Sequence, residues 1–143
     1  MQQDQGNAAE ADRLPKPRTV VLSIPADREQ VVLVRSVAGH IAARLGLSMA
    51  ELADLRLAVD EACGLFLLAP GFGSGGEMVD CRFEESAAAL VVTMSAPAPP
   101  AVEPDVDDIG WLMLSALVDE LTWKAEQGVA KLTLIKHLSV RGS

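Results

Sequence analysis

The chain has 143 residues, which suits one domain with a substantial core, and half of them are apolar although only 3% are aromatic. The formal net charge is −8, from 12 basic and 20 acidic residues. A surface that binds nucleic acid needs clustered basic side chains to neutralise phosphates, so we do not expect this acidic chain to bind DNA or RNA directly. The composition instead favours a basic protein partner.

The cysteine content and the apolar runs bear on the cellular compartment. Cys63 and Cys81 do not have the spacing of a metal site, and Cys63 lies in an apolar stretch where a small core residue is expected. No N-terminal stretch combines the basic and apolar regions of a signal peptide. No apolar run reaches the roughly 18 residues of a membrane span. We therefore expect a cytoplasmic protein with reduced thiols and no membrane association.

The chain divides into a tail and one domain. Residues 1–18 are polar, contain a glycine and two prolines, and show no apolar periodicity, which predicts a disordered tail. One domain is expected over residues 19–143. It opens with a β-rich run at 19–24 that predicts a strand ended by Pro25.

Two helices are predicted next. Apolar residues recur at spacings of three and four between Val31 and Leu45, the pattern of a helix with one buried face, and Asp27 with Gln30 resembles a capping box before it. A second capping box, Ser48 with Glu51, opens a helix that we place at 52–69 (LADLRLAVDEACGLFLLA).

An acidic step, Asp60-Glu61, interrupts this strongly apolar second helix. Burying an acid costs free energy unless the acid has a partner or a function, so this step is the candidate functional site. The helix is expected to stop at Pro70. The glycine-rich run 71–76 is read as a flexible loop, because it lacks the lysine and spacing of a phosphate-binding loop.

Strand patterns dominate the rest of the chain. Residues 78–83 and 89–95 predict a hairpin with its turn at 84–86. Residues 96–108 hold four prolines and four acids, so a long loop is expected there. A third helix at 109–121 follows.

A second hairpin, with strands at 121–125 and 129–138, is expected to close the domain. The element order is therefore β-α-α-β-β-α-β-β. It predicts an α/β protein: a two-layer sandwich with three helices on one face of a mixed, mainly antiparallel sheet.

Residues 54–63 (DLRLAVDEAC), followed by a hairpin, a loop and the segment 110–121, resemble a known bacterial family. These are the anti-sigma factors and switch-protein serine kinases that hold sigma-B- or sigma-F-type factors, and the LRLAVDEAC stretch is similar to their actinobacterial branch. The resemblance covers about residues 19–138. It implies the histidine-kinase-like ATPase (GHKL) fold.

The resemblance also implies where a nucleotide site would lie. In that superfamily the central helix carries Glu-x-x-x-Asn, in which the glutamate orients the attacking group and the asparagine binds Mg²⁺. Glu61 matches the glutamate, but Leu65 stands at the asparagine position and has no oxygen for a metal. Glu61 is thus expected to be a catalytic remnant.

The two other nucleotide motifs are altered as well. The Asp-x-Gly-x-Gly motif that recognises adenine reads Ala96, Ala98 and Pro100 here. Of the glycines that would cradle phosphate at the last helix, only Gly110 remains, beside two aspartates that repel phosphate. We therefore expect no ATP or Mg²⁺ cofactor and no kinase activity. The alternative is an active ATP-dependent serine/threonine kinase.

Several of these residues have plainer interpretations. The plainer interpretation of Glu61 is a structural acid bonded to a backbone amide or to an arginine such as Arg56 or Arg82. Trp111 is expected in the core, or in space that a nucleotide would otherwise fill. His137 has no nucleophile or carboxylate at an informative spacing, so a structural role is expected for it.

The resemblance also implies protein partners for this chain. It implies a homodimer that sequesters an alternative sigma factor and is captured by an anti-anti-sigma (STAS-type) protein. The remaining alternative is an α/β interaction domain without nucleotide ancestry. The candidate partner surface is the polar side of the first helix, with Arg28, Arg35, His40 and Arg44. These basic residues would meet an acidic patch on a sigma factor; the plainer interpretation is a solvated helix face.

Overall fold

The computed structural model describes residues 18–67, 76–97 and 107–138. Apart from Arg18, which begins the first strand, the predicted tail lies outside the described residues. The elements in chain order are β1 (Arg18–Pro25), a 3-10 turn η1 (Arg28–Gln30), α2 (Val31–Arg44), α3 (Met49–Leu67), β2 (Met78–Glu85), β3 (Ala89–Pro97), α4 (Ile109–Leu117), β4 (Glu120–Glu126) and β5 (Val129–His137).

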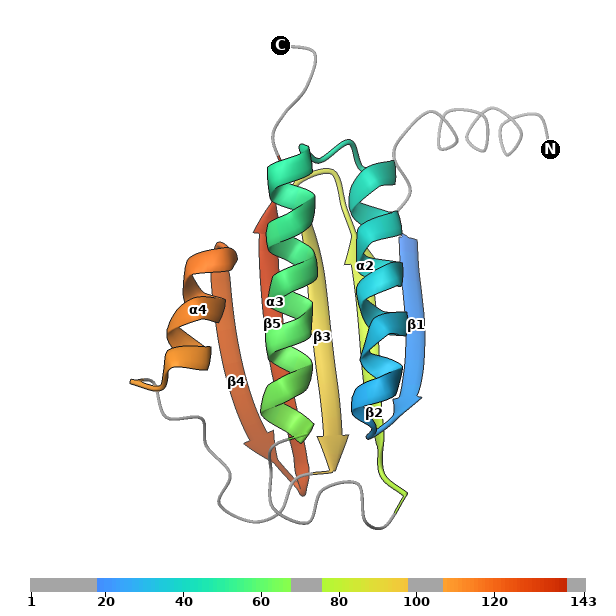
Figure 1. The fold of residues 1–143 in the computed structure, drawn as a ribbon, viewed down its shortest axis with the longest axis vertical. Coiled ribbons are helices and arrows are strands. Elements are labelled where there is room, and N and C mark those ends of the chain that lie inside the picture. Colours follow the sequence, from blue (N-terminus) through green and yellow to red (C-terminus); the bar gives the residue numbers. More distant parts are fainter. Residues whose placement is uncertain (1–17, 68–75, 98–106, 139–143) are drawn as a thin grey trace, which may run out of the picture.

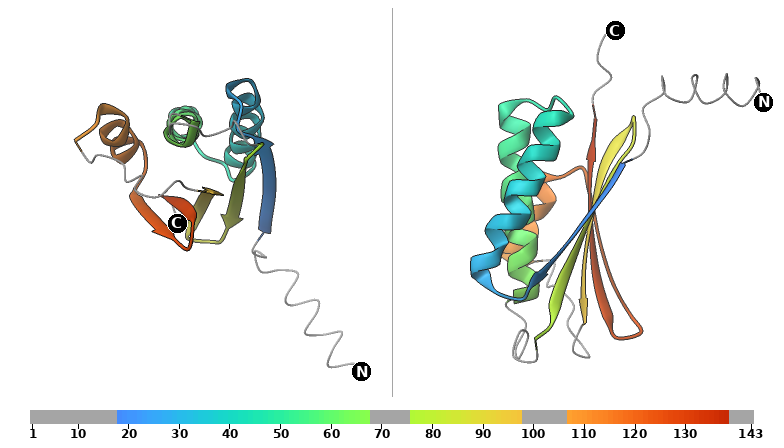
Figure 2. Two further views of the ribbon diagram at one scale, coloured as in Figure 1. Left: turned by 90° about the horizontal axis from the view of Figure 1, so that it is seen from below. Right: turned by 90° about the vertical axis from the view of Figure 1, so that its right-hand side faces the viewer.

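The strands form one five-stranded sheet in the order β1-β2-β3-β5-β4, and the four described pairings are all antiparallel. All three helices lie on one face of this sheet (Figures 1 and 2). The predicted two-layer α/β class is therefore confirmed. Because residues alternate along each strand, one side chain in two points toward the helices, and on β2, β3 and β5 most of these side chains are buried.

The start of α3 follows from its capping box. Ser48 N donates to Glu51 Oε1 at 3.0 Å, and Glu51 N donates to Ser48 Oγ at 3.1 Å, so the prediction from these two residues is confirmed. The helix accordingly begins at Met49, earlier than residue 52. Before α2, Asp27 Oδ1 instead accepts from Glu29 N at 3.0 Å, so the box with Gln30 is wrong.

The predicted strand and helix ends need correction. β2 continues to Glu85 and β3 continues to Pro97, so Ala96 belongs to a strand and not to the long loop. The helix expected to reach residue 121 ends at Leu117, because Val118 is extended (φ −128°, ψ 165°). β4 then begins at Glu120, whose pairing with β5 replaces helical hydrogen bonds.

The core lies between the sheet and the helices. The inward side chains of β2 include Cys81 and the fully buried Phe83, and Cys63 of α3 is also buried, as predicted for a small core residue. Burial raises the pKa of the Cys81 thiol to about 12 and also raises that of Cys63, where the neighbouring Cys81 adds to the effect. Both thiols therefore stay protonated and unreactive at neutral pH.

Within residues 18–67, 76–97 and 107–138, no helix combines the length and apolarity that crossing a membrane requires. The longest, α3, carries acidic side chains at several positions, including Asp60 and Glu61.

Candidate functional site

The acidic step on α3 separates into two different environments. Asp60 Oδ1 accepts two hydrogen bonds from Arg35 of α2, at 2.7 Å from Nη2 and 3.2 Å from Nε. Both side chains are 36% exposed, so this pair joins the two helices at a partly solvated interface. Asp60 thus has a structural partner, which the sequence reasoning missed.

Glu61 is half-buried and forms no hydrogen bond or ion pair with any other described residue. The expected partner Arg82 donates instead to Glu84 at 3.1 Å, and no described ion pair joins Glu61 to Arg56. Glu61 Oε2 lies 3.7 Å from the place where a Cβ on Gly110 would stand, as does Asp108 Oδ2. The fold therefore brings together Glu61 and Gly110, the two residues expected as remnants of a nucleotide site.

Two of the other positions implied by the nucleotide motifs, Leu65 and Ala96, are described, and both are apolar and at least partly buried. Leu65 is partly buried against the core, and Trp111 of α4 packs against the same core. Ala96 is 3% exposed and pairs with Ala130 of β5. Ala98 and Pro100 lie outside the described residues. This environment provides no carboxylate at residue 96 and no amide oxygen at residue 65.

A pocket of about 360 Å³ borders Glu61 on the side of α3 that faces α2. We refer to it as the α2–α3 pocket. Its wall carries charges of both signs, including the Arg35–Asp60 pair, and it is lined by Arg28, Val31, Arg35, Asp60, Glu61, Gly64 and Leu67.

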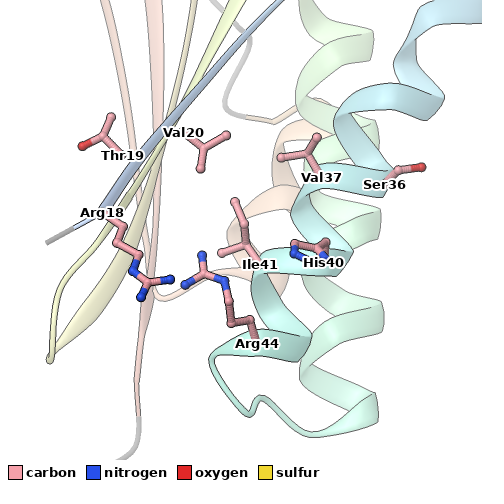
Figure 3. A pocket seen from close by; sticks show the side chains of 8 residues that line it. All are labelled: Arg18, Thr19, Val20, Ser36, Val37, His40, Ile41 and Arg44. Carbon is pink, nitrogen blue, oxygen red and sulfur yellow. The ribbon is translucent and has the colours of Figure 1, made fainter. Parts of the chain in front are cut away.

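A larger and more apolar groove of about 770 Å³ lies between β1 and α2. Figure 3 shows this β1–α2 groove, with the guanidinium groups of Arg18 and Arg44 pointing toward one another at one end. Val20, Val37 and Ile41 supply its apolar surface. The remaining lining residues are Thr19, Ser36 and His40.

Arg44 has a second role at the end of this groove. It forms an ion pair with Glu85, whose side chain is only 7% exposed and which is the one charged residue buried among the described residues. Arg18 is the register partner of Glu85 across β1 and β2. The two arginines therefore outnumber the one carboxylate, and this end of the groove is net positive.

The structure divides the four residues expected on one polar helix side. Arg28 and Arg35 line the α2–α3 pocket, whereas His40 and Arg44 line the β1–α2 groove. The four residues therefore do not share one surface, and their role in partner binding stays a prediction. At about 100° per residue, the nine positions from Arg35 to Arg44 amount to about two and a half turns, so these two side chains lie on opposite sides of α2.

The remaining histidine takes part in strand contacts. His137 Nε2 lies 2.8 Å from Glu120 Oε2, and its backbone N donates to Asp119 Oδ2 at 2.6 Å. These contacts fasten the end of β5 to the start of β4. No cluster of three or more metal-ligating side chains occurs in the described parts of the chain.

Comparisons with known proteins agree with this architecture. Residues 24–136 match the family described as "Histidine kinase-like ATPase domain". The chain is 25% identical to the serine-protein kinase RsbW of Halalkalibacterium halodurans, over 88% of this chain and 87% of that protein. It is also similar in fold (TM-score 0.61, 18% identity) to the crystal structure of the RsbU and RsbW domains of Rv1364c from Mycobacterium tuberculosis, over 83% of this chain but only 32% of that one. The chain therefore belongs to the histidine kinase-like ATPase domain family.

Proposed function

We propose that this chain is an anti-sigma factor that sequesters an alternative sigma factor and is antagonised by a STAS-type anti-anti-sigma protein, without binding ATP. The similarity to RsbW extends over most of both chains and supports the regulatory class. The finer proposal is supported by the match to the family over residues 24–136, together with the apolar side chains of Leu65 and Ala96 at the positions where the resemblance places the Mg²⁺ and adenine ligands.

The loss of nucleotide binding has a direct physical reason. Mg²⁺ takes oxygen ligands, and Leu65 has none to offer. Adenine recognition needs a side chain that can accept from its amino group, which Ala96 lacks. The remaining carboxylates, Glu61 and Asp108, lie close to Gly110, where a bound phosphate would meet their negative charge.

The β1–α2 groove is the proposed docking surface for a protein partner. It combines an apolar floor with a basic end on a chain whose net charge is −8, so it suits an acidic, partly apolar segment of a partner. Among the four basic residues singled out from the sequence, this assigns partner contact to His40 and Arg44. The protein is proposed to act as a homodimer in the cytoplasm.

A second candidate function is an active serine/threonine kinase that phosphorylates the STAS protein. One observation favours it: Glu61 is retained beside Gly110 and forms no hydrogen bond or ion pair with another described residue. The two functions differ in how a partner is released. A kinase frees itself by phosphorylating the STAS protein, whereas a chain without ATP responds only to competition, with the phosphorylation state of the STAS protein set elsewhere.

Co-purification tests the regulatory proposal. The tagged protein, expressed in its host, is expected to retain an alternative sigma factor, and addition of an unphosphorylated STAS protein is expected to displace it, because both partners compete for the same protein. Mass spectrometry of the bound fraction identifies the partners. Failure to bind any sigma factor or STAS protein of the host would refute the proposal.

Isothermal titration calorimetry with ATP and Mg²⁺ separates the two candidates. The wild-type protein is expected to show no binding heat, because residues 65 and 96 lack ligand atoms. The Glu61→Ala variant serves as the matched control and should give the same flat titration. Micromolar binding by the wild-type chain, weakened in this variant, would instead support the kinase.

A further inference from the structure

The outward face of α4 is a stripe of apolar side chains that no other described element covers. α4 lies at one end of the helix layer, and α3 separates it from α2 (Figures 1 and 2). Its inward side packs on the core through Leu114, which is fully buried. On the exposed side, apolar residues recur at the i, i+3, i+4, i+7 spacing of one helix face, which we call the α4 stripe: Ile109, Leu112, Met113 and Ala116.

The α4 stripe is more exposed than ordinary packing of a surface helix would leave it. Ile109 is 74% exposed, Leu112 53% and Met113 39%. Single exposed apolar residues are common on protein surfaces, whereas a contiguous group of them marks an interaction surface. The helix contains no charged residue from Ile109 to Leu117, so the stripe is not interrupted by a group that favours water. The stripe therefore suits a partner that covers it.

The charges at the amino end of α4 are acidic. Glu61 Oε2 and Asp108 Oδ2 both lie 3.7 Å from the same point, the position that a Cβ on Gly110 would take. Neither carboxylate forms an ion pair with any residue that the structure describes. The amino end of the helix offsets part of this charge, but it carries only about half a unit of positive charge against two carboxylates. This end of the stripe therefore attracts a cationic group.

The acids around the stripe also discriminate among possible partners. Asp108 precedes α4, and Asp119 and Glu120 follow it. A second copy that paired through its own α4 would bring its acids against these acids, whichever way the two helices ran. An anionic membrane surface would be repelled for the same reason. The charge distribution therefore favours a partner that is both apolar and basic.

We propose that the α4 stripe docks an amphipathic helix of a partner protein, which carries apolar residues on one face and a lysine or arginine that reaches Glu61 and Asp108. The apolar residues cover Leu112 and Met113, as in other helices that bind through anchors at i, i+3, i+4 and i+7. The basic residue forms charge-assisted hydrogen bonds to the two carboxylates. α4 has nine residues and is about 14 Å long, so two to three turns of the partner helix cover it.

This surface is separate from the β1–α2 groove, which lies on the far side of α2 from α3 and α4. The proposal therefore goes beyond the proposed function and does not depend on it. Loss of binding at the α4 stripe and loss of binding at the groove are measured with different variants.

NMR titration of the ¹⁵N-labelled full chain tests the docking surface. The probe is a designed helical peptide of about 14 residues, with leucine at the i, i+3, i+4 and i+7 positions and lysine at the others. A control peptide has glutamate in place of lysine. We expect the lysine peptide to shift the amide signals of α4 and to bind at least about tenfold more tightly than the glutamate peptide, because only lysine can pair with Glu61 and Asp108. No binding by the lysine peptide, or shifts that leave α4 unaffected, would overturn the proposal.

Variants on the exposed face separate docking from general attraction to an acidic chain. Leu112→Ser combined with Met113→Ser removes apolar surface without changing the charge and is expected to weaken binding of the lysine peptide at least about tenfold. Leu33→Ser is the matched control, because Leu33 is 45% exposed but lies on α2, and its effect should stay within about twofold. Asp108→Asn should weaken binding more at low salt than at high salt. Thermal unfolding confirms that each variant folds, and equal losses in the double variant and in Leu33→Ser would contradict the assignment to α4.

Two further measurements test the other possible occupants. Sedimentation of the wild-type chain would reveal a self-association through the stripe if the double variant abolished it. Vesicles of phosphatidylglycerol would reveal membrane binding with the same dependence on Leu112 and Met113. We expect neither result, and either one would assign the stripe to a second copy or to a membrane and overturn the proposal of a basic partner helix.

Discussion

Replacing Arg44 with alanine is expected to lower the free energy of unfolding by about 3 kcal/mol. The substitution removes the ion-pair partner of Glu85, whose side chain is 7% exposed, and leaves a carboxylate away from bulk water. A buried charge without its partner costs far more than an exposed ion pair contributes. Urea unfolding measures the effect as a lower midpoint with an unchanged slope.

Arg35→Ala provides the matched control for this experiment. It breaks the pair with Asp60, but both of those side chains are 36% exposed, so water can solvate the carboxylate that remains. The expected cost is within about 1 kcal/mol. If both variants lost the same small amount, Glu85 would have found another partner, and Arg18, its register neighbour, is the nearest candidate.

Reversing the charge at Arg18 is expected to weaken the binding of the proposed sigma-factor partner by at least roughly tenfold. Arg18 is exposed at the positive end of the β1–α2 groove, so Arg18→Glu changes the charge that a partner meets without removing a buried side chain. Surface plasmon resonance should show a lower association rate and less complex for the variant. Raising the salt concentration should reduce the difference in association rate between the variant and the wild type.

Arg82→Glu is the control for this charge reversal. It changes the net charge by the same amount, but Arg82 lies on β2 among the side chains that point away from the helices, next to Glu84. Its effect on partner binding is expected to stay within about twofold, because Arg82 lies on the face of the sheet opposite the helices and the groove. Equal losses in the two variants would show that overall charge, and not the groove, governs association.

Much of the fold was predictable because local and long-range preferences agree. Ser48 and Glu51 form a capping box in which both hydrogen bonds join residues only three positions apart, and both hydrogen bonds are present in the structure. The end of α4 was not predictable in this way. Val118 and Leu121 continue an apolar helical stripe, but Leu121 pairs with Leu134 on β5, and this strand contact decides the conformation.

The candidate site shows a similar division. Glu61 and Gly110 were singled out separately, and the fold places them side by side. The partner of Asp60 was missed, because an ion pair between helices depends on their relative rotation, which a single sequence does not give.

The two outer strands of the sheet differ in their capacity to add a further strand. β4 carries Glu120, Lys124 and Glu126, and charged side chains of this kind discourage pairing between sheet edges. β1 has no charged side chain between Arg18 and Pro25, and its Val21 is 59% exposed. A strand from a second chain is therefore expected to extend the sheet beside β1, so that self-association and capture of an acidic partner would take place in the same region of the molecule.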